Sequence, residues 1–112
     1  MLKLKEIEIP IYNYTIEFVS GYIGEVVDYY RDVEKVELGV NKNHAACTWN
    51  LGHKSVIWFD EETITIFIMN HEIGHAIFNM MDCIGLELTD EEAFCYSQEY
   101  VLKEATKYIQ MN

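Results

Sequence analysis

The feature that most constrains this chain is an H-E-I-G-H motif at residues 71–75, set inside an otherwise apolar run from residue 64 to 81. Residues four apart lie one above the other on an α-helix, so His71 and His75 can offer two imidazole nitrogens to one cation. Glu72 is then close enough to hydrogen-bond a metal-bound water without being a ligand. Apart from the histidines, Glu72 is the only acidic or basic residue in the run. A surface helix would instead carry charged residues along one whole face. The pattern predicts a zinc-binding helix.

Composition and charge limit the partners of this predicted site. The length of 112 residues suits one domain, residues 1–112, and the formal net charge is −11 with only eight basic residues. Because these basic residues are scattered, we expect no binding to nucleic acid. No apolar run approaches the length of a membrane span or forms a signal-peptide core, which predicts no membrane partner and a cytoplasmic location.

Hydrophobic alternation predicts an α+β fold with a small antiparallel or mixed sheet of about three strands. Residues 7–19 are predicted to be extended, with a change of register at Pro10, which marks an edge or a bulge. Residues 44–49 and 54–59 have the β-branched and aromatic content of two strands, and the Asn-Leu-Gly-His sequence between them predicts a hairpin.

Three helices are predicted to pack on this sheet. The first covers residues 21–33 and is capped by Ser20. The metal helix follows Asp60 as its cap and ends just before Gly85. The last helix runs to about residue 109 and starts with the capping-box spacing of Thr89 and Glu92.

A catalytic zinc needs a third protein ligand besides two histidines, with one position left open for water. The metzincin extension of the motif requires Gly at position 78 and His at position 81, where this chain has Phe78 and Met81. His44 and His53 stand at strand and turn positions, where surface histidines are the simpler interpretation. We therefore expect a carboxylate from the last helix.

An H-E-x-G-H helix followed by a helix that starts with acidic residues and Ala resembles the gluzincin metallopeptidases. More narrowly, HEIGHAIF at residues 71–78 and DEEAFCY at residues 90–96 look like small phage and prophage proteins of the zinc-peptidase type. These proteins are distantly similar to the ImmA/IrrE group, which is associated with the cleavage of repressors. The resemblance implies a minimal zincin-like core with the motif on its central helix, a zinc cofactor and a glutamate ligand from the second helix.

Three acids at the start of the last helix, Asp90, Glu91 and Glu92, remain open as this third ligand. We favour Glu92 and then Glu91, because Ala93 is small enough to let the two helices approach closely. The competing interpretation makes Glu92 a helix cap. Tyr96, one turn further on, could donate its hydroxyl to a tetrahedral oxyanion, and its alternative role is in packing.

The predicted function is the hydrolysis of peptide bonds by a zinc-activated water, with Glu72 as the general base that later protonates the leaving amine. We expect a protein or peptide substrate that lies extended along the hairpin strand at residues 54–59. The alternatives are a catalytically silent zinc-binding domain that acts through protein contacts, and a structural protein without metal. The presence of Glu72 favours catalysis, because zinc binding alone does not require it.

Overall fold

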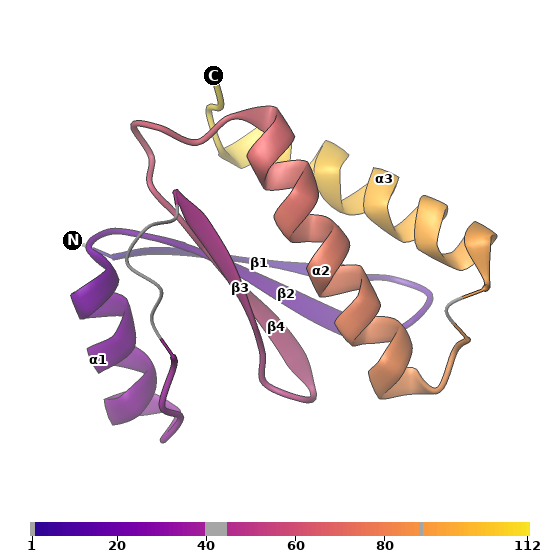
Figure 1. The fold of residues 1–112 in the computed structure, drawn as a ribbon, viewed down its shortest axis with the longest axis horizontal. Coiled ribbons are helices and arrows are strands. Elements are labelled where there is room, and N and C mark those ends of the chain that lie inside the picture. The colour runs from indigo at the N-terminus through magenta and orange to yellow at the C-terminus, as the bar shows by residue number, and fades with distance from the viewer. Residues whose placement is uncertain (1, 40–44, 88) are drawn as a thin grey trace.

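The computed structural model describes residues 2–39, 45–87 and 89–112. Four strands form one mixed sheet in the order β1-β2-β4-β3 (Figure 1). The strands β2 and β4 are parallel, whereas β1 pairs with β2 and β3 pairs with β4 in antiparallel fashion. The predicted α+β class is therefore confirmed. The strands are β1 (Lys3–Ile9), β2 (Tyr14–Ser20), β3 (Ala46–Asn50) and β4 (Lys54–Phe59).

The sheet has four strands where about three were predicted, because residues 7–19 contribute to two strands. A turn separates these strands, closed by hydrogen bonds from the Tyr12 and Asn13 amides to the Ile9 carbonyl. Asn13 takes the left-handed conformation, with φ of 51°, which Asn tolerates better than most residues. Pro10 opens this turn directly after β1, and β1 becomes an edge strand, as the proline suggested.

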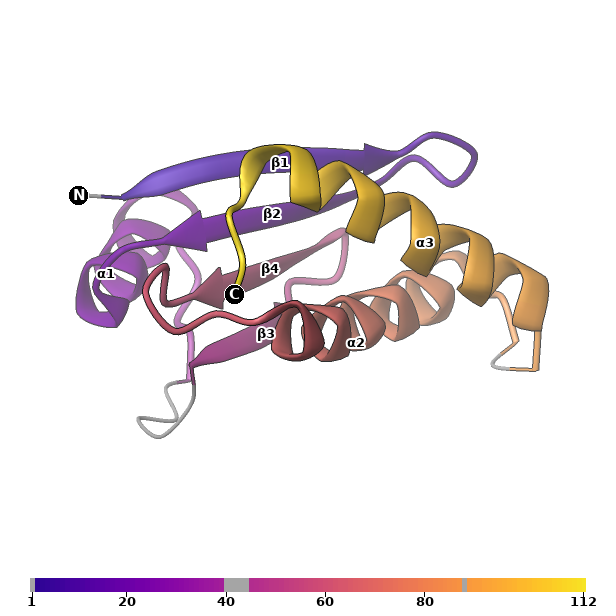
Figure 2. The same cartoon turned by 90° about the horizontal axis from the view of Figure 1, so that it is seen from above.

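The helices divide between the two faces of the sheet. Figure 1 shows α1 (Ile23–Val33) on one side, and α2 (Ile66–Ile84) and α3 (Glu91–Tyr108) on the other. Seen from above, α2 and α3 lie side by side, with α2 packed against β3 and β4 and α3 packed against β1 (Figure 2). Each face has its own apolar core, and the larger core, under α2 and α3, includes Ile16, Phe18, Ile57, Met69, Ile73, Ile77 and Val101.

The helix α2 is bounded by two residues with clear local roles. Thr65 is its N-cap, because the Thr65 side chain accepts a hydrogen bond from the Ile68 amide at 3.1 Å. The predicted cap, Asp60, was wrong: its carboxylate accepts from the Glu62 amide in the preceding turn. At the other end, Gly85 adopts φ of 78° and closes the helix, as predicted.

Two other predicted caps are also wrong. The Ser20 hydroxyl donates to Glu61 at 2.6 Å, so it ties the end of β2 to the segment before α2 and does not cap α1. The cap of α3 is Asp90, whose carboxylate accepts from the Ala93 amide at 3.1 Å, one residue after the predicted Thr89. Both differences reflect helix starts that lie one or two residues later than the sequence pattern suggested.

We predict that Gly74→Ala stabilises the protein by about 0.5–1 kcal/mol, because glycine is a poor residue for a helix interior. A Cβ atom at Gly74 would approach the Gln98 amide nitrogen only to 3.7 Å, which is an ordinary van der Waals contact. Urea unfolding measures the change. Gly85→Ala is the matched control and should lower the free energy of unfolding, because position 85 needs a left-handed backbone. A loss of stability in Gly74→Ala would contradict the open packing at this site.

Candidate metal centre

The two motif histidines already face one another on the exposed side of α2. Their Nε2 atoms are 3.1 Å apart, and the rings are nearly perpendicular at 85°. Two nitrogen ligands bonded at about 2.0–2.1 Å to one tetrahedral zinc lie about 3.3 Å apart. Without a metal, the same separation suits an N–H···N hydrogen bond between the two rings. The pair His71 and His75 thus fits a shared cation without rearrangement of the helix.

Glu72 projects from the same helix toward the sheet and is only 9% exposed. The Thr48 hydroxyl on β3 donates to Glu72 Oε1 at 2.9 Å and also lies 3.1 Å from the Glu72 carbonyl oxygen. A buried carboxylate is unfavourable without such a hydrogen bond. Sequence reasoning missed Thr48, since a threonine in a predicted strand gives no sign of which helix it will face.

His71, Glu72 and His75 form a group that could hold a metal ion. Each residue offers one possible ligand atom, and these atoms all lie within 4.8 Å of one another. Over the ranges that the structure describes, it is the one cluster of three or more such side chains with this spacing. The predicted metal-binding helix therefore presents its donor atoms together.

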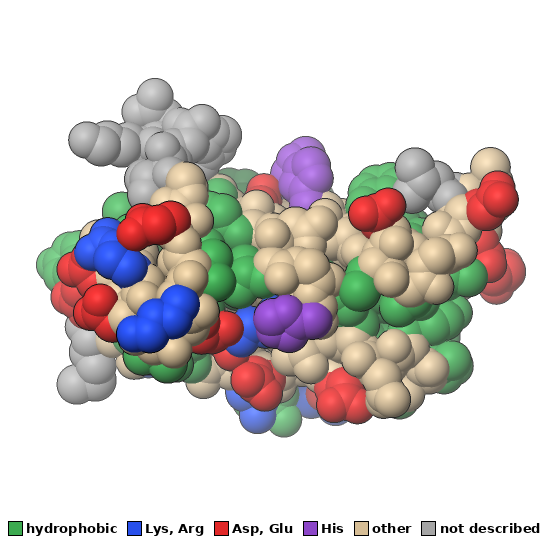
Figure 3. Space-filling model, turned by 90° about the horizontal axis from the view of Figure 1, so that it is seen from below, with side chains coloured by type: hydrophobic (Ala, Val, Ile, Leu, Met, Phe, Trp, Pro, Cys, Tyr) green, Lys and Arg blue, Asp and Glu red, His purple; other side chains and the backbone are tan. Residues whose placement is uncertain are grey.

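An open groove of about 830 Å³ runs beside this group, between α2 and β3. One turn before His71, the Phe67 side chain is 83% exposed and lines the groove, as does Trp49 on β3. Figure 3 shows a face of the molecule on which histidine side chains reach the surface among neutral and hydrophobic groups, with acidic side chains dispersed around them. The imidazoles of His71 and His75 are exposed and line this groove.

The structure does not bring Glu91, Glu92 or Asp90 into the metal group. The helices α2 and α3 are joined by a short connection, so the start of α3 lies beside the end of α2, away from the motif in its first half (Figure 2). At the level of the motif, α3 places Gln98, whose amide donates to the Asn70 carbonyl at 3.4 Å. The α3 residue that contacts α2 beside the motif is therefore an amide and not one of the three predicted acids.

Two other candidate residues, Tyr96 and His53, lie outside the metal group. Tyr96 is 40% exposed and stacks on Tyr100 with ring centroids 6.3 Å apart. His53 is exposed in the turn between β3 and β4, as the simpler interpretation held. His44 lies outside the residues that the structure describes.

The strand expected to bind substrate was wrongly chosen. The strand β4 lies between β2 and β3, so both of its edges are already paired. The edge beside the motif is that of β3, which has no second neighbouring strand in the described part of the chain. Two backbone hydrogen bonds, one at each end of β3, show which residues of β3 bond to β4. The Leu51 amide donates to the Lys54 carbonyl, and the Asp60 amide donates to the Ala45 carbonyl.

This pattern decides which backbone groups of β3 point outward. In an antiparallel pair, residues alternate between positions that bond to the neighbouring strand and positions that point away from it. Since Ala45 and Leu51 bond inward, the N–H and C=O groups of Ala46, Thr48 and Asn50 point to the free edge. The same three residues line the groove.

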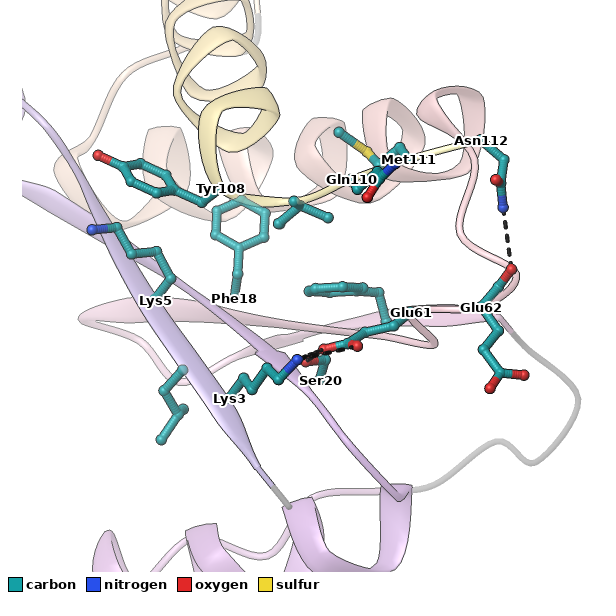
Figure 4. A pocket seen from close by; sticks show the side chains of 13 residues that line it. Lys3, Lys5, Phe18, Ser20, Glu61, Glu62, Tyr108, Gln110, Met111 and Asn112 are labelled. Carbon is teal, nitrogen blue, oxygen red and sulfur yellow. Dashed lines mark hydrogen bonds and ion pairs between the residues drawn. The ribbon is translucent and has the colours of Figure 1, made fainter.

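A second cavity, of about 560 Å³, lies between β1 and the C-terminal segment (Figure 4). Its polar side chains bind one another: Lys3 and Ser20 both contact Glu61, and the Asn112 amide donates to the Glu62 carbonyl. It holds no cluster of metal-ligating side chains among the described residues. The site of interest is therefore the groove beside α2.

The chain has no significant match among protein-family models, curated proteins or solved structures. The candidate metal centre must therefore be interpreted from its own chemistry. None of the described helices combines the length and the apolar content needed to cross a membrane.

The three cysteines, Cys47, Cys83 and Cys95, are unpaired. Burial and the nearby Glu72 carboxylate raise the pKa of the Cys47 thiol to about 12, so this thiol is neutral at physiological pH.

Proposed function

We propose that this protein is a zinc-dependent peptidase with a minimal zincin-like site, and that it acts in the cytoplasm, in keeping with its resemblance to phage and prophage proteins. The observation that supports this function best is the position of Glu72. A metal-binding pair alone needs no carboxylate beside it, yet Glu72 is held in a mostly buried place next to both imidazoles. A carboxylate in this position suits proton transfer.

Each residue of the group has a distinct role in this proposal. His71 and His75 would hold zinc through Nε2, and the bound metal would supply a Lewis acid that activates water. The Glu72 carboxylate accepts the proton of the attacking water and passes it to the nitrogen of the leaving amine. The helix α2 fixes the order of these three groups, because all come from consecutive turns of one rigid element.

The substrate that fits the groove is an extended peptide. The outward N–H and C=O groups of Ala46, Thr48 and Asn50 can bind a peptide backbone as an added strand. The exposed Phe67 ring offers an apolar surface to one of its side chains. The net charge of −11 further favours a substrate that carries basic residues.

A catalytically silent zinc-binding domain is the second candidate. It is favoured by one observation: no acid of α3 joins the metal group, so the described residues supply only two imidazoles and Glu72. A silent domain would use the groove for binding a partner without cleaving it. The two candidates differ in the need for Glu72 and in turnover.

Zinc-loaded protein is expected to cleave fluorescein-labelled casein, and 1,10-phenanthroline should reduce the cleavage to the level of buffer alone. Stoichiometric zinc added after removal of the chelator should restore it, because the histidine pair is accessible from the groove. Cleavage is measured as release of soluble fluorescence. Zinc-loaded protein that cleaves neither casein nor a mixed-sequence fluorogenic peptide library would favour the silent domain.

A further inference from the structure

The contact between Thr48 and Glu72 connects two parts of the groove. The Thr48 side chain points to α2 and donates to Glu72 Oε1, while the Thr48 backbone groups point to the free edge of β3. Within the described ranges, Thr48 provides the only side-chain hydrogen bond to the Glu72 carboxylate. The residue that would touch a bound peptide strand is therefore the residue that holds the carboxylate.

We propose that Thr48 is a positioning residue that holds one oxygen of Glu72 and leaves the other oxygen directed to the reacting water. This inference rests on the proposed peptidase function. A hydroxyl has one proton to donate, and the shorter contact, to Oε1, identifies the carboxylate as its main acceptor. The strand β3 is paired to β4 through its inward residues, and this pairing fixes the position of Thr48 along α2. A peptide bound to the same residue would then have a fixed register relative to Glu72.

Thr48→Val and Thr48→Ser form the matched pair that tests this inference. Valine keeps the branched shape that suits a strand and removes the hydroxyl, whereas serine keeps the hydroxyl. Thr15→Val is the control, because Thr15 lies in β2 and has no side-chain hydrogen bond among the described residues. All three variants are compared as full chains with verified folding.

The first readout needs neither metal nor substrate. In protein labelled with ¹³C at glutamate side-chain carboxyls, the Glu72 signal is identified as the one absent from Glu72→Gln. At fixed pH this signal should move in Thr48→Val, stay near its wild-type position in Thr48→Ser and stay unchanged in Thr15→Val. A Glu72 signal that does not move in Thr48→Val overturns the inference.

The second readout is cleavage of fluorescein-labelled casein by the zinc-loaded variants. Loss of a hydrogen bond to a charged group should lower kcat about 10- to 100-fold in Thr48→Val with little change in KM, and Thr48→Ser should recover most of kcat. In a Glu72→Gln background, Thr48→Val should cause no further loss, because its effect passes through Glu72. An equal further loss there would overturn the positioning role.

The two readouts separate this inference from the proposed function. If the wild-type protein binds zinc but cleaves no substrate, the peptidase function is wrong, and any role of Thr48 in turnover is wrong with it. The carboxyl signal would still show whether Thr48 holds Glu72. If the wild type cleaves casein and Thr48→Val cleaves it equally well, the function stands and the positioning role is refuted.

Discussion

Glu72→Gln is expected to lower the turnover of the zinc-loaded protein by about 10²- to 10⁴-fold, the usual effect of removing a general base. Glutamine keeps the size of the side chain and an oxygen that can accept the Thr48 hydrogen bond, but it has no basic carboxylate. Zinc content and the unfolding midpoint should therefore stay near the wild-type values. The measurements are initial rates on casein, elemental analysis and thermal unfolding.

The control for this prediction is Glu99→Gln, which removes the charge of an exposed carboxylate on α3. It should leave the rate unchanged. If Glu72→Gln retains the wild-type rate while substitution of either motif histidine abolishes it, the carboxylate is not the base. The mechanism with Glu72 as the general base would then be wrong, and another group would have to accept the proton of the attacking water.

His75→Ala is expected to weaken zinc binding by more than about 100-fold. Changes to residues that only support a metal ligand cost 10- to 100-fold in affinity, so loss of one of two facing imidazoles should exceed that range. Elemental analysis of protein purified without added metal should give one zinc per wild-type chain and none for the variant. A competition titration with a zinc chelator measures the difference in affinity.

The matched control for His75→Ala is His53→Ala, because His53 is exposed in the β3–β4 turn. This variant should retain full zinc content. A wild-type protein that carries no zinc and takes up none on titration would contradict both metal-dependent functions. Equal losses in His53→Ala and His75→Ala would place the metal elsewhere on the chain.

Local sequence patterns were sufficient for the elements that frame the site. The α+β class, the β3–β4 hairpin and the end of α2 at Gly85 followed from alternation, apolar content and a glycine suited to a left-handed cap. The motif itself required only helical spacing, and the structure confirms that His71, Glu72 and His75 lie together. These features depend on residues close in sequence.

Apart from the three helix caps, which are local errors at helix starts, the errors concern contacts between distant segments. Sequence patterns did not reveal that β4 would pair on both edges and leave β3 at the edge, because strand order depends on pairing across the whole sheet. The small Ala93 favoured Glu92 as a ligand, but the antiparallel register of α2 and α3 brings Gln98 to the level of the motif. The Thr48–Glu72 contact spans 24 positions and has no local signature.

The candidate metal ligands and the core residues lie on opposite sides of α2. Met69, Ile73 and Ile77 are fully buried on one side, while His71 and His75 are exposed on the other. Since the apolar side packs without the imidazoles, a metal ion would stabilise the fold only by mass action, by about 4 kcal/mol at a concentration 1,000 times its Kd. If the proposed function holds, the chain can fold before it binds the metal, and the availability of zinc would set how much of the folded protein is active.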